Sequence, residues 1–133
     1  MKPTPPVTRA LLETKAALEA AGHTVIQWEP YDMAKSAQII NKLFTGDGGA
    51  KIASSIALSG EDWPLGLAGF AAAHLKTRDN PPIVGDLWTV QAERVSYCKN
   101  MLDKWMASAA LTGTGRPIDG LLTPTTAFSA CPQ

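Results

Sequence analysis

Apolar positions along the chain repeat with the spacing of amphipathic helices. In the first such segment one stripe carries Val7, Leu11, Thr14, Leu18 and Ala21. The prolines just before it hold the chain extended, and Gly22 follows as a residue that tolerates the positive φ of a helix end. The pattern therefore predicts a first helix that begins near residue 7 or 8 and ends before Gly22.

Four more helices are predicted, and each is bounded by residues that break helices. They span residues 33–44, 50–58, 65–76 and 85–110. Asp32 is placed to cap the first of these four, and Gly46–Gly49 is a turn because glycine is costly inside a helix. The last and longest helix has an apolar face that includes Leu87, Val95 and Cys98. Cys98 is therefore expected to be a buried, unreactive thiol.

Two short runs have the composition of strands instead. Thr24–Trp28 is β-branched and lies between Gly22 and Pro30, and Asp119–Pro124 begins as a turn and continues as an apolar run. Helix, glycine and strand in this order are typical of layered α/β folds, so we expect an α/β fold in which helices pack on a short mixed or parallel sheet fragment. Two short strands are too few for five helices to cover. We therefore expect the rest of the sheet to be missing from this chain, which would leave an exposed apolar patch on the helices.

Composition excludes several classes of function. The 133 residues fit one domain, and their 12 basic and 12 acidic residues cancel, which argues against a nucleic acid or a charged membrane surface as partner. No apolar run approaches the roughly 20 residues of a membrane span, and the first residues do not resemble a signal peptide. Two cysteines do not make a disulfide framework, so a cytoplasmic location is expected.

The first candidate for chemistry is the group Lys51, Ser54 and Ser55. A serine nucleophile needs a base within hydrogen-bond reach and donors for the oxyanion. These serines lie inside a helix pattern, where the backbone N–H groups are already used by the helix. We interpret them as ordinary helix serines and expect no catalytic residue in this chain.

Phosphate and metal sites are not indicated either. The turn Gly46–Gly49 is not followed by the lysine and hydroxyl residue of a phosphate-binding loop. Neither His23 nor His74 has a second potential ligand at the sequence spacing that is typical of metal sites. Asp47, Glu61 and Asp62 lie in predicted turns, so we interpret them as solvated acids without a catalytic role. No metal and no cofactor are therefore expected.

Several short motifs follow one another in a specific order over essentially all of the chain. They are Pro5-Pro6-Val7-Thr8-Arg9-Ala10-Leu11, Leu18-Glu19-Ala20-Ala21-Gly22-His23-Thr24-Val25, Asp47-Gly48-Gly49, Leu58-Ser59-Gly60-Glu61, Leu87-Trp88 with Arg94, Tyr97 and Lys104-Trp105, and Ile118-Asp119-Gly120-Leu121-Leu122-Thr123-Pro124. In order and spacing they resemble the late part of the amidase-signature family, in particular its fungal acetamidase-like members.

The resemblance implies a hydrolase of carboxylic amides that uses a Ser–cis-Ser–Lys triad beside a Gly/Ser-rich signature. This chain contains no such Gly/Ser-rich run, so no triad residue can be assigned to it. We expect residues 1–133 to be a partial domain, the C-terminal segment of the amidase-signature fold, inactive alone. Its partner would be the missing N-terminal catalytic portion, and a small amide would bind only in the complete enzyme.

Two alternatives stay open at this point. The chain has the length and apolar content of a non-catalytic α/β binding or scaffold module that folds alone. It would also suit one half of a split amidase that docks on a second chain carrying the triad.

The resemblance also implies a site. Residues just after the last strand of the family's fold line the acyl pocket, which makes Thr123, Pro124, Thr125 and Thr126 the candidates for substrate binding. The alternative, that these residues only turn the chain, remains equally open.

Overall fold

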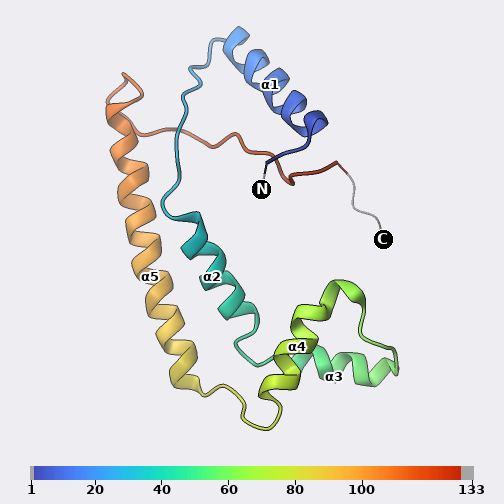
Figure 1. Ribbon diagram of the computed structural model, residues 1–133. Coiled ribbons are helices and arrows are strands. Elements are labelled where there is room, and N and C mark those ends of the chain that lie inside the picture. The colour runs from blue at the N-terminus through green and yellow to red at the C-terminus, as the bar shows by residue number, and fades with distance from the viewer. Residues whose placement is uncertain (1, 130–133) are drawn as a thin grey trace. The chain divides into compact units, whose positions relative to one another are not determined.

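A computed structural model describes residues 2–129, and these residues form helices connected by irregular segments. The helices are α1 (Pro5–Ala20), α2 (Met33–Phe44), α3 (Ala50–Ser59), α4 (Ala68–Thr77) and α5 (Val84–Ala107), with short 3-10 helices η1 (Leu65–Leu67) and η2 (Ser108–Ala110) (Figure 1). The chain divides into two compact units. One combines Met1–Pro30 with Leu102–Gln133, and the other is Tyr31–Met101.

The helix boundaries follow the local signals in the sequence. Helix α2 has the predicted bounds, and the carboxylate of Asp32 accepts a hydrogen bond from the Lys35 backbone N–H at 2.9 Å. Helix α1 begins at Pro5, two residues earlier than predicted, because proline is tolerated in a first turn whose N–H groups have no partner in the helix. Gly60 ends α3 in the left-handed conformation.

The prediction of an α/β fold is wrong, because residues 2–129 contain no β-strand. The two segments expected to contribute strands, Thr24–Trp28 and Asp119–Pro124, are irregular. A β-branched composition favours an extended backbone, but a strand exists only where a neighbouring backbone pairs with it. Within the described part of the chain neither segment has such a partner. The composition of these two segments therefore correctly predicted that they are not helical, but the prediction that they form a sheet is wrong.

In the unit Tyr31–Met101, α2 lies alongside α5 (Figure 1). The rings of Tyr31 and Tyr97 are 5.6 Å apart, and the Tyr97 hydroxyl donates a hydrogen bond of 2.7 Å to the Tyr31 carbonyl. The glycine turn before α3 packs on α4, where the Thr77 hydroxyl donates to the Gly48 carbonyl at 3.0 Å. These contacts join helices that are distant in sequence.

In the other unit the residues before α1 contact a segment from the last described part of the chain. The Thr4 backbone N–H donates to the Ala127 carbonyl at 2.7 Å. Trp28 packs edge-on against Trp105 with ring centroids 5.8 Å apart. The buried Ser108 accepts a hydrogen bond from the Ile118 N–H at 2.9 Å, which holds the segment after η2.

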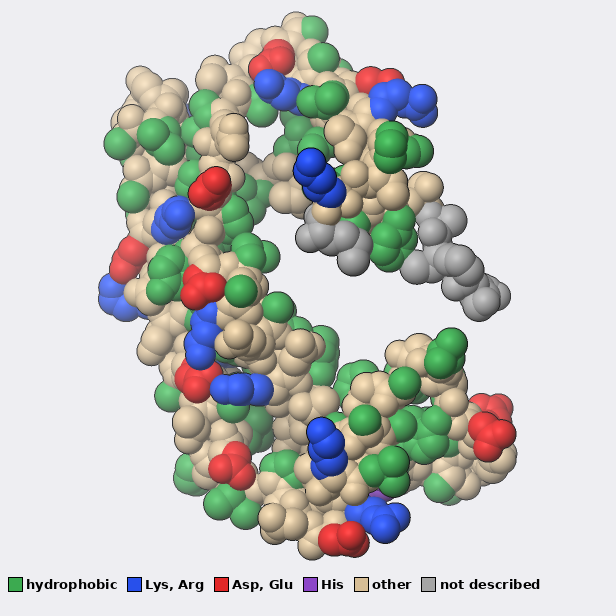
Figure 2. Space-filling view, viewed as in Figure 1, with side chains coloured by type: hydrophobic (Ala, Val, Ile, Leu, Met, Phe, Trp, Pro, Cys, Tyr) green, Lys and Arg blue, Asp and Glu red, His purple; other side chains and the backbone are tan. Residues whose placement is uncertain are grey.

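The helices bury little apolar surface. Among the described residues Ile39 is the buried large apolar side chain, whereas many leucines, valines and aromatics remain exposed. Figure 2 shows apolar side chains reaching the surface over the helices. The sequence predicted exposed apolar helix faces, and the structure has them. No helix in the described part of the chain is long and apolar enough to cross a membrane.

Candidate functional site

The four residues predicted to bind substrate lie together on one open groove. Thr123, Pro124, Thr125 and Thr126 line a depression of about 300 Å³. The remaining lining residues come from one face of α1 and from the chain end, namely Val7, Ala10, Leu11, Thr14, Leu122, Phe128 and Ser129. The structure therefore places the predicted residues beside α1, and every side chain in this lining is uncharged.

Backbone contacts hold the two walls of the groove together. The hydrogen bond from Thr4 to Ala127 ties the residue before α1 to the segment that carries the predicted site. Thr4 also supplies the carbonyl that accepts the Thr8 N–H at 2.9 Å, so it begins the helix as well. On the other wall the Thr126 hydroxyl donates to the Phe128 carbonyl. The groove is thus built from residues at opposite ends of the sequence.

The lining limits the chemistry that the groove can perform. Threonine hydroxyls can donate and accept hydrogen bonds, while Val7, Leu11 and Phe128 offer apolar contact. Such a surface suits a small neutral molecule that has one polar group. Among these lining residues no side chain can serve as a general base for a hydroxyl nucleophile.

A second depression, of about 520 Å³, lies on another face of α1. It is lined by Pro3, Pro5, Thr8, Arg9, Leu12 and Glu13. Arg9 and Glu13 are 3.6 Å apart, and both side chains are exposed, so these charges face each other and water. The groove at Thr123–Thr126 is the better candidate because two separate segments converge on it.

Ser54 and Ser55 have no features of a nucleophile. Their hydroxyls donate to the Lys51 carbonyl, at 2.8 and 3.1 Å. This is the usual arrangement of serines within a helix. Lys51 contributes to this contact through its backbone carbonyl, and its backbone N–H donates to the Asp47 carboxylate at 2.9 Å.

Asp47 is more than a solvated turn acid. Its carboxylate accepts hydrogen bonds from the backbone N–H groups of Gly49 at 2.7 Å and Lys51 at 2.9 Å. The hydrogen bond from the Lys51 N–H is the main cause that lowers the pKa of Asp47, and the hydrogen bond from the Gly49 N–H acts in the same direction. Asp47 therefore caps α3. His74 itself stacks on Trp63, with centroids 6.4 Å apart.

Metal ligands are not gathered anywhere in the described part of the chain. Across residues 2–129, no three His, Cys, Asp or Glu side chains are close enough together to hold an ion. The acidic side chains with perturbed pKa are bound instead by backbone N–H groups and lysines.

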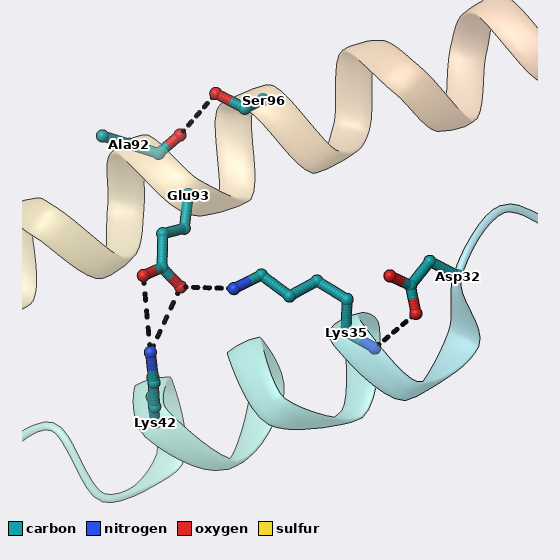
Figure 3. Close-up of polar contacts among 6 residues, drawn as sticks. All are labelled: Asp32, Lys35, Lys42, Ala92, Glu93 and Ser96. Carbon is teal, nitrogen blue, oxygen red and sulfur yellow. Dashed lines mark hydrogen bonds and ion pairs between the residues drawn. The ribbon is translucent and has the colours of Figure 1, made fainter.

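The charged cluster that the sequence did not reveal joins α2 to α5. Lys35 and Lys42 on α2 both point at Glu93 on α5, with nitrogen–oxygen distances of 3.2 Å (Figure 3). The hydrogen bond from Lys35, followed by that from Lys42, lowers the pKa of Glu93. Lys35 and Lys42 lie seven residues apart and so share a helix face, a signal that could have suggested a common partner.

Cys98 is exposed, so the prediction of a buried thiol is wrong. The side of α5 that faces α2 and the residue Tyr31 before it carries Glu93 and Tyr97. Cys98 does not lie on that side, although apolar periodicity alone could not show which of the two faces would be covered. Cys131 lies outside the described residues.

Comparison with known proteins gives a consistent result. A model of the family described as Amidase matches residues 1–133. A putative amidase, kk1C, of Curvularia clavata is 34% identical over 113 residues, covering 85% of this chain and 21% of that protein. An acetamidase of Aspergillus oryzae is 30% identical over 134 residues, covering 98% of this chain and 23% of that protein.

A more distant group gives a similar match. Fatty-acid amide hydrolase 1 of Sus scrofa is 31% identical over 128 residues, covering 79% of this chain and 22% of that protein. The chain thus spans about a fifth of the length of these relatives. No solved structure matches the chain significantly.

Proposed function

Because this chain belongs to the amidase family, whose model matches it from end to end, we propose that it supplies the C-terminal segment of a hydrolase of carboxylic amides. The full-length family match is the observation that carries the proposal. The motif order supports it, and so do the relatives named as acetamidases. The triad would reside in the remaining portion of the enzyme, so this segment alone would be inactive.

The groove at Thr123–Thr126 gives this segment a role in substrate binding. We assign these four residues to contact the acyl part of the amide in the complete enzyme. A neutral lining with hydroxyl groups and apolar side chains matches the chemistry of a small uncharged amide. The attacking serine and its oxyanion donors would come from outside this chain.

The partner in this proposal is the N-terminal catalytic portion of an amidase, and the complete enzyme would act in the cytoplasm. The small number of cysteines supports a reducing compartment. No metal or cofactor is needed, because serine and lysine supply the nucleophile and base in the proposed reaction.

A chimera tests the proposed function. The region of the Aspergillus oryzae acetamidase that matches this chain would be replaced by these residues, and acetamide turnover would be measured. We expect turnover above that of the acetamidase lacking the region. A chimera that melts cooperatively yet hydrolyses none of a panel of short amides would contradict the proposal.

The groove can be tested in the same chimera. Thr125→Val removes one exposed hydroxyl while nearly keeping the shape of the side chain, and the loss of one hydrogen bond of about 1 kcal/mol would raise KM roughly fivefold. Thr89→Val, on the exposed surface of α5, is the matched control and should leave KM unchanged. Equal KM values for both variants would show that the Thr125 hydroxyl does not contact the substrate.

A further inference from the structure

Two adjacent leucines of α1 have different surroundings. Leu11 lines the groove at Thr123–Thr126. Leu12 instead lines the second depression, beside the paired charges of Arg9 and Glu13. Successive residues of a helix lie about 100° apart around its axis, so the two side chains leave α1 on different sides. Leu11 is half-buried and Leu12 is 58% accessible to solvent, so α1 presents one leucine to the groove and keeps the other outside it.

Apolar side chains line both walls of the groove. Val7 and Leu11 lie one turn apart on α1, and both are half-buried. On the other wall Leu122 and Phe128 are 39% and 38% accessible to solvent. Along α1 the lining reaches Thr14, seven residues after Val7, which corresponds to roughly 10 Å of helix. The groove is therefore long enough for a chain of several carbons.

The polar groups of the lining side chains are hydroxyls. The Thr14 hydroxyl donates to the Ala10 carbonyl at 2.8 Å, and the Thr126 hydroxyl donates to the Phe128 carbonyl. No lining side chain is charged, so the groove does not favour an acyl group with a charged end. Each methylene group buried against apolar side chains tightens binding about fourfold, which favours an aliphatic chain.

We propose that Leu11 determines which acyl groups this groove accepts, and that the preferred group is an unbranched aliphatic chain. This inference rests on the proposed function and names the acyl class that binds at the same site. The acyl chain lies along Val7 and Leu11, and the amide group faces the hydroxyls of Thr123–Thr126. Leu11 limits the size of the acyl group because it lies midway along the α1 side of the groove, between Val7 and Thr14.

Substitutions of opposite size at Leu11 test the inference in the chimera with the Aspergillus oryzae acetamidase. Leu11→Ala widens the groove and Leu11→Trp fills it, so the two variants should change the acyl preference in opposite directions. We expect the ratio of kcat/KM for hexanamide to kcat/KM for acetamide to rise about tenfold in Leu11→Ala and to fall about tenfold in Leu11→Trp. A purely structural role of Leu11 would lower both values together and leave the ratio unchanged.

Leu12 supplies the matched controls. Leu12→Ala and Leu12→Trp make the same changes at the next residue of α1, which lies outside the groove. These variants should keep the ratio within twofold of the unmodified chimera. Equal changes of the ratio at both positions, or no change at Leu11, would overturn the inference.

Photolabelling gives a second measurement that does not require turnover. A hexanamide with a diazirine near the end of its chain would be irradiated with the chimera, and fragment-ion mass spectrometry would locate the label. We expect label on Val7, Leu11 or Thr14 that excess hexanamide prevents, and none on Leu12. A label that is missing from these three residues of α1 would contradict the proposed position of the acyl chain.

The two measurements separate this inference from the proposed function. An inactive chimera that is still labelled on the Leu11 side of α1 would refute the proposed function alone. An active chimera whose acyl preference does not respond to Leu11 would refute the inference alone.

Discussion

Gly48 and Gly60 show how two residues with the same backbone conformation can differ in what they tolerate. Both have positive φ, +66° at Gly48 and +69° at Gly60. A Cβ at Gly48 would lie 2.2 Å from the Thr77 hydroxyl oxygen, whereas a Cβ at Gly60 would meet nothing within 4 Å. Gly48 therefore supports a close approach of the turn to α4, while Gly60 supports only a helix end.

This difference predicts unequal effects of alanine. Gly60→Ala should cost about 1 kcal/mol through its left-handed backbone alone. Gly48→Ala adds overpacking against Thr77 and should cost about 1–3 kcal/mol more. Denaturant melts followed by circular dichroism at the helix band would measure both. Equal losses in the two variants would contradict the packing of the glycine turn on α4.

Between elements, the contact of α2 with α5 depends on polar as well as aromatic groups. Glu93 accepts from two lysines, and Tyr97 reaches the Tyr31 carbonyl. The hydrogen bonds from Lys35 and then Lys42 hold the pKa of Glu93 below its ordinary value of 4.5, because the lysines favour the charged form. The charged form is the stabilising one, so this stabilisation is complete above pH 4.5 and is lost as the pH falls through the lowered value.

Removal of the charge should therefore loosen α2 on α5. We expect Glu93→Gln to speed amide hydrogen exchange in α2 severalfold at pH 7, and 0.5 M salt should have a smaller effect of the same sign on the unmodified chain. Lowering the pH from 6 to 3 should weaken the unmodified chain more than the variant. Glu19→Gln, which breaks the pair with Lys15 on α1, is the control and should leave α2 unchanged.

At the scale of the whole molecule, the described residues expose apolar side chains that a self-sufficient protein would bury. Leu58 and Leu65 are 90% and 93% accessible, and Ile39 is the buried apolar side chain of the described residues. Folding gains little where so little apolar surface leaves water. The segment of a larger amidase proposed above would leave such side chains exposed, whereas a scaffold module that folds alone would bury them.

The isolated chain should therefore behave as a loosely packed helical protein. We expect strong binding of the dye ANS, a broad thermal transition and a poorly dispersed NMR spectrum, together with the far-ultraviolet signal of helices. A sharp cooperative melt without dye binding would show that the chain folds alone, and would favour the binding-module interpretation over the amidase segment.

Local interactions explain what the sequence determined by itself. The bounds of α2, the cap at Asp32 and the glycine turn depend on residues a few positions apart, which is the range over which helices start and stop. The order of motifs likewise identified the amidase family, which the match over residues 1–133 confirmed. These features needed no knowledge of distant contacts.

Only the tertiary structure decided the features that depend on distant partners. Thr24–Trp28 had the composition of a strand but lacks a pairing backbone, and Cys98 had apolar neighbours but lies on an uncovered face. The bonds from Lys35 and Lys42 to Glu93, and the groove between α1 and Thr123–Thr126, bring together residues more than 50 positions apart. Pattern along the chain determines which face of an element is apolar, and packing determines whether anything covers it.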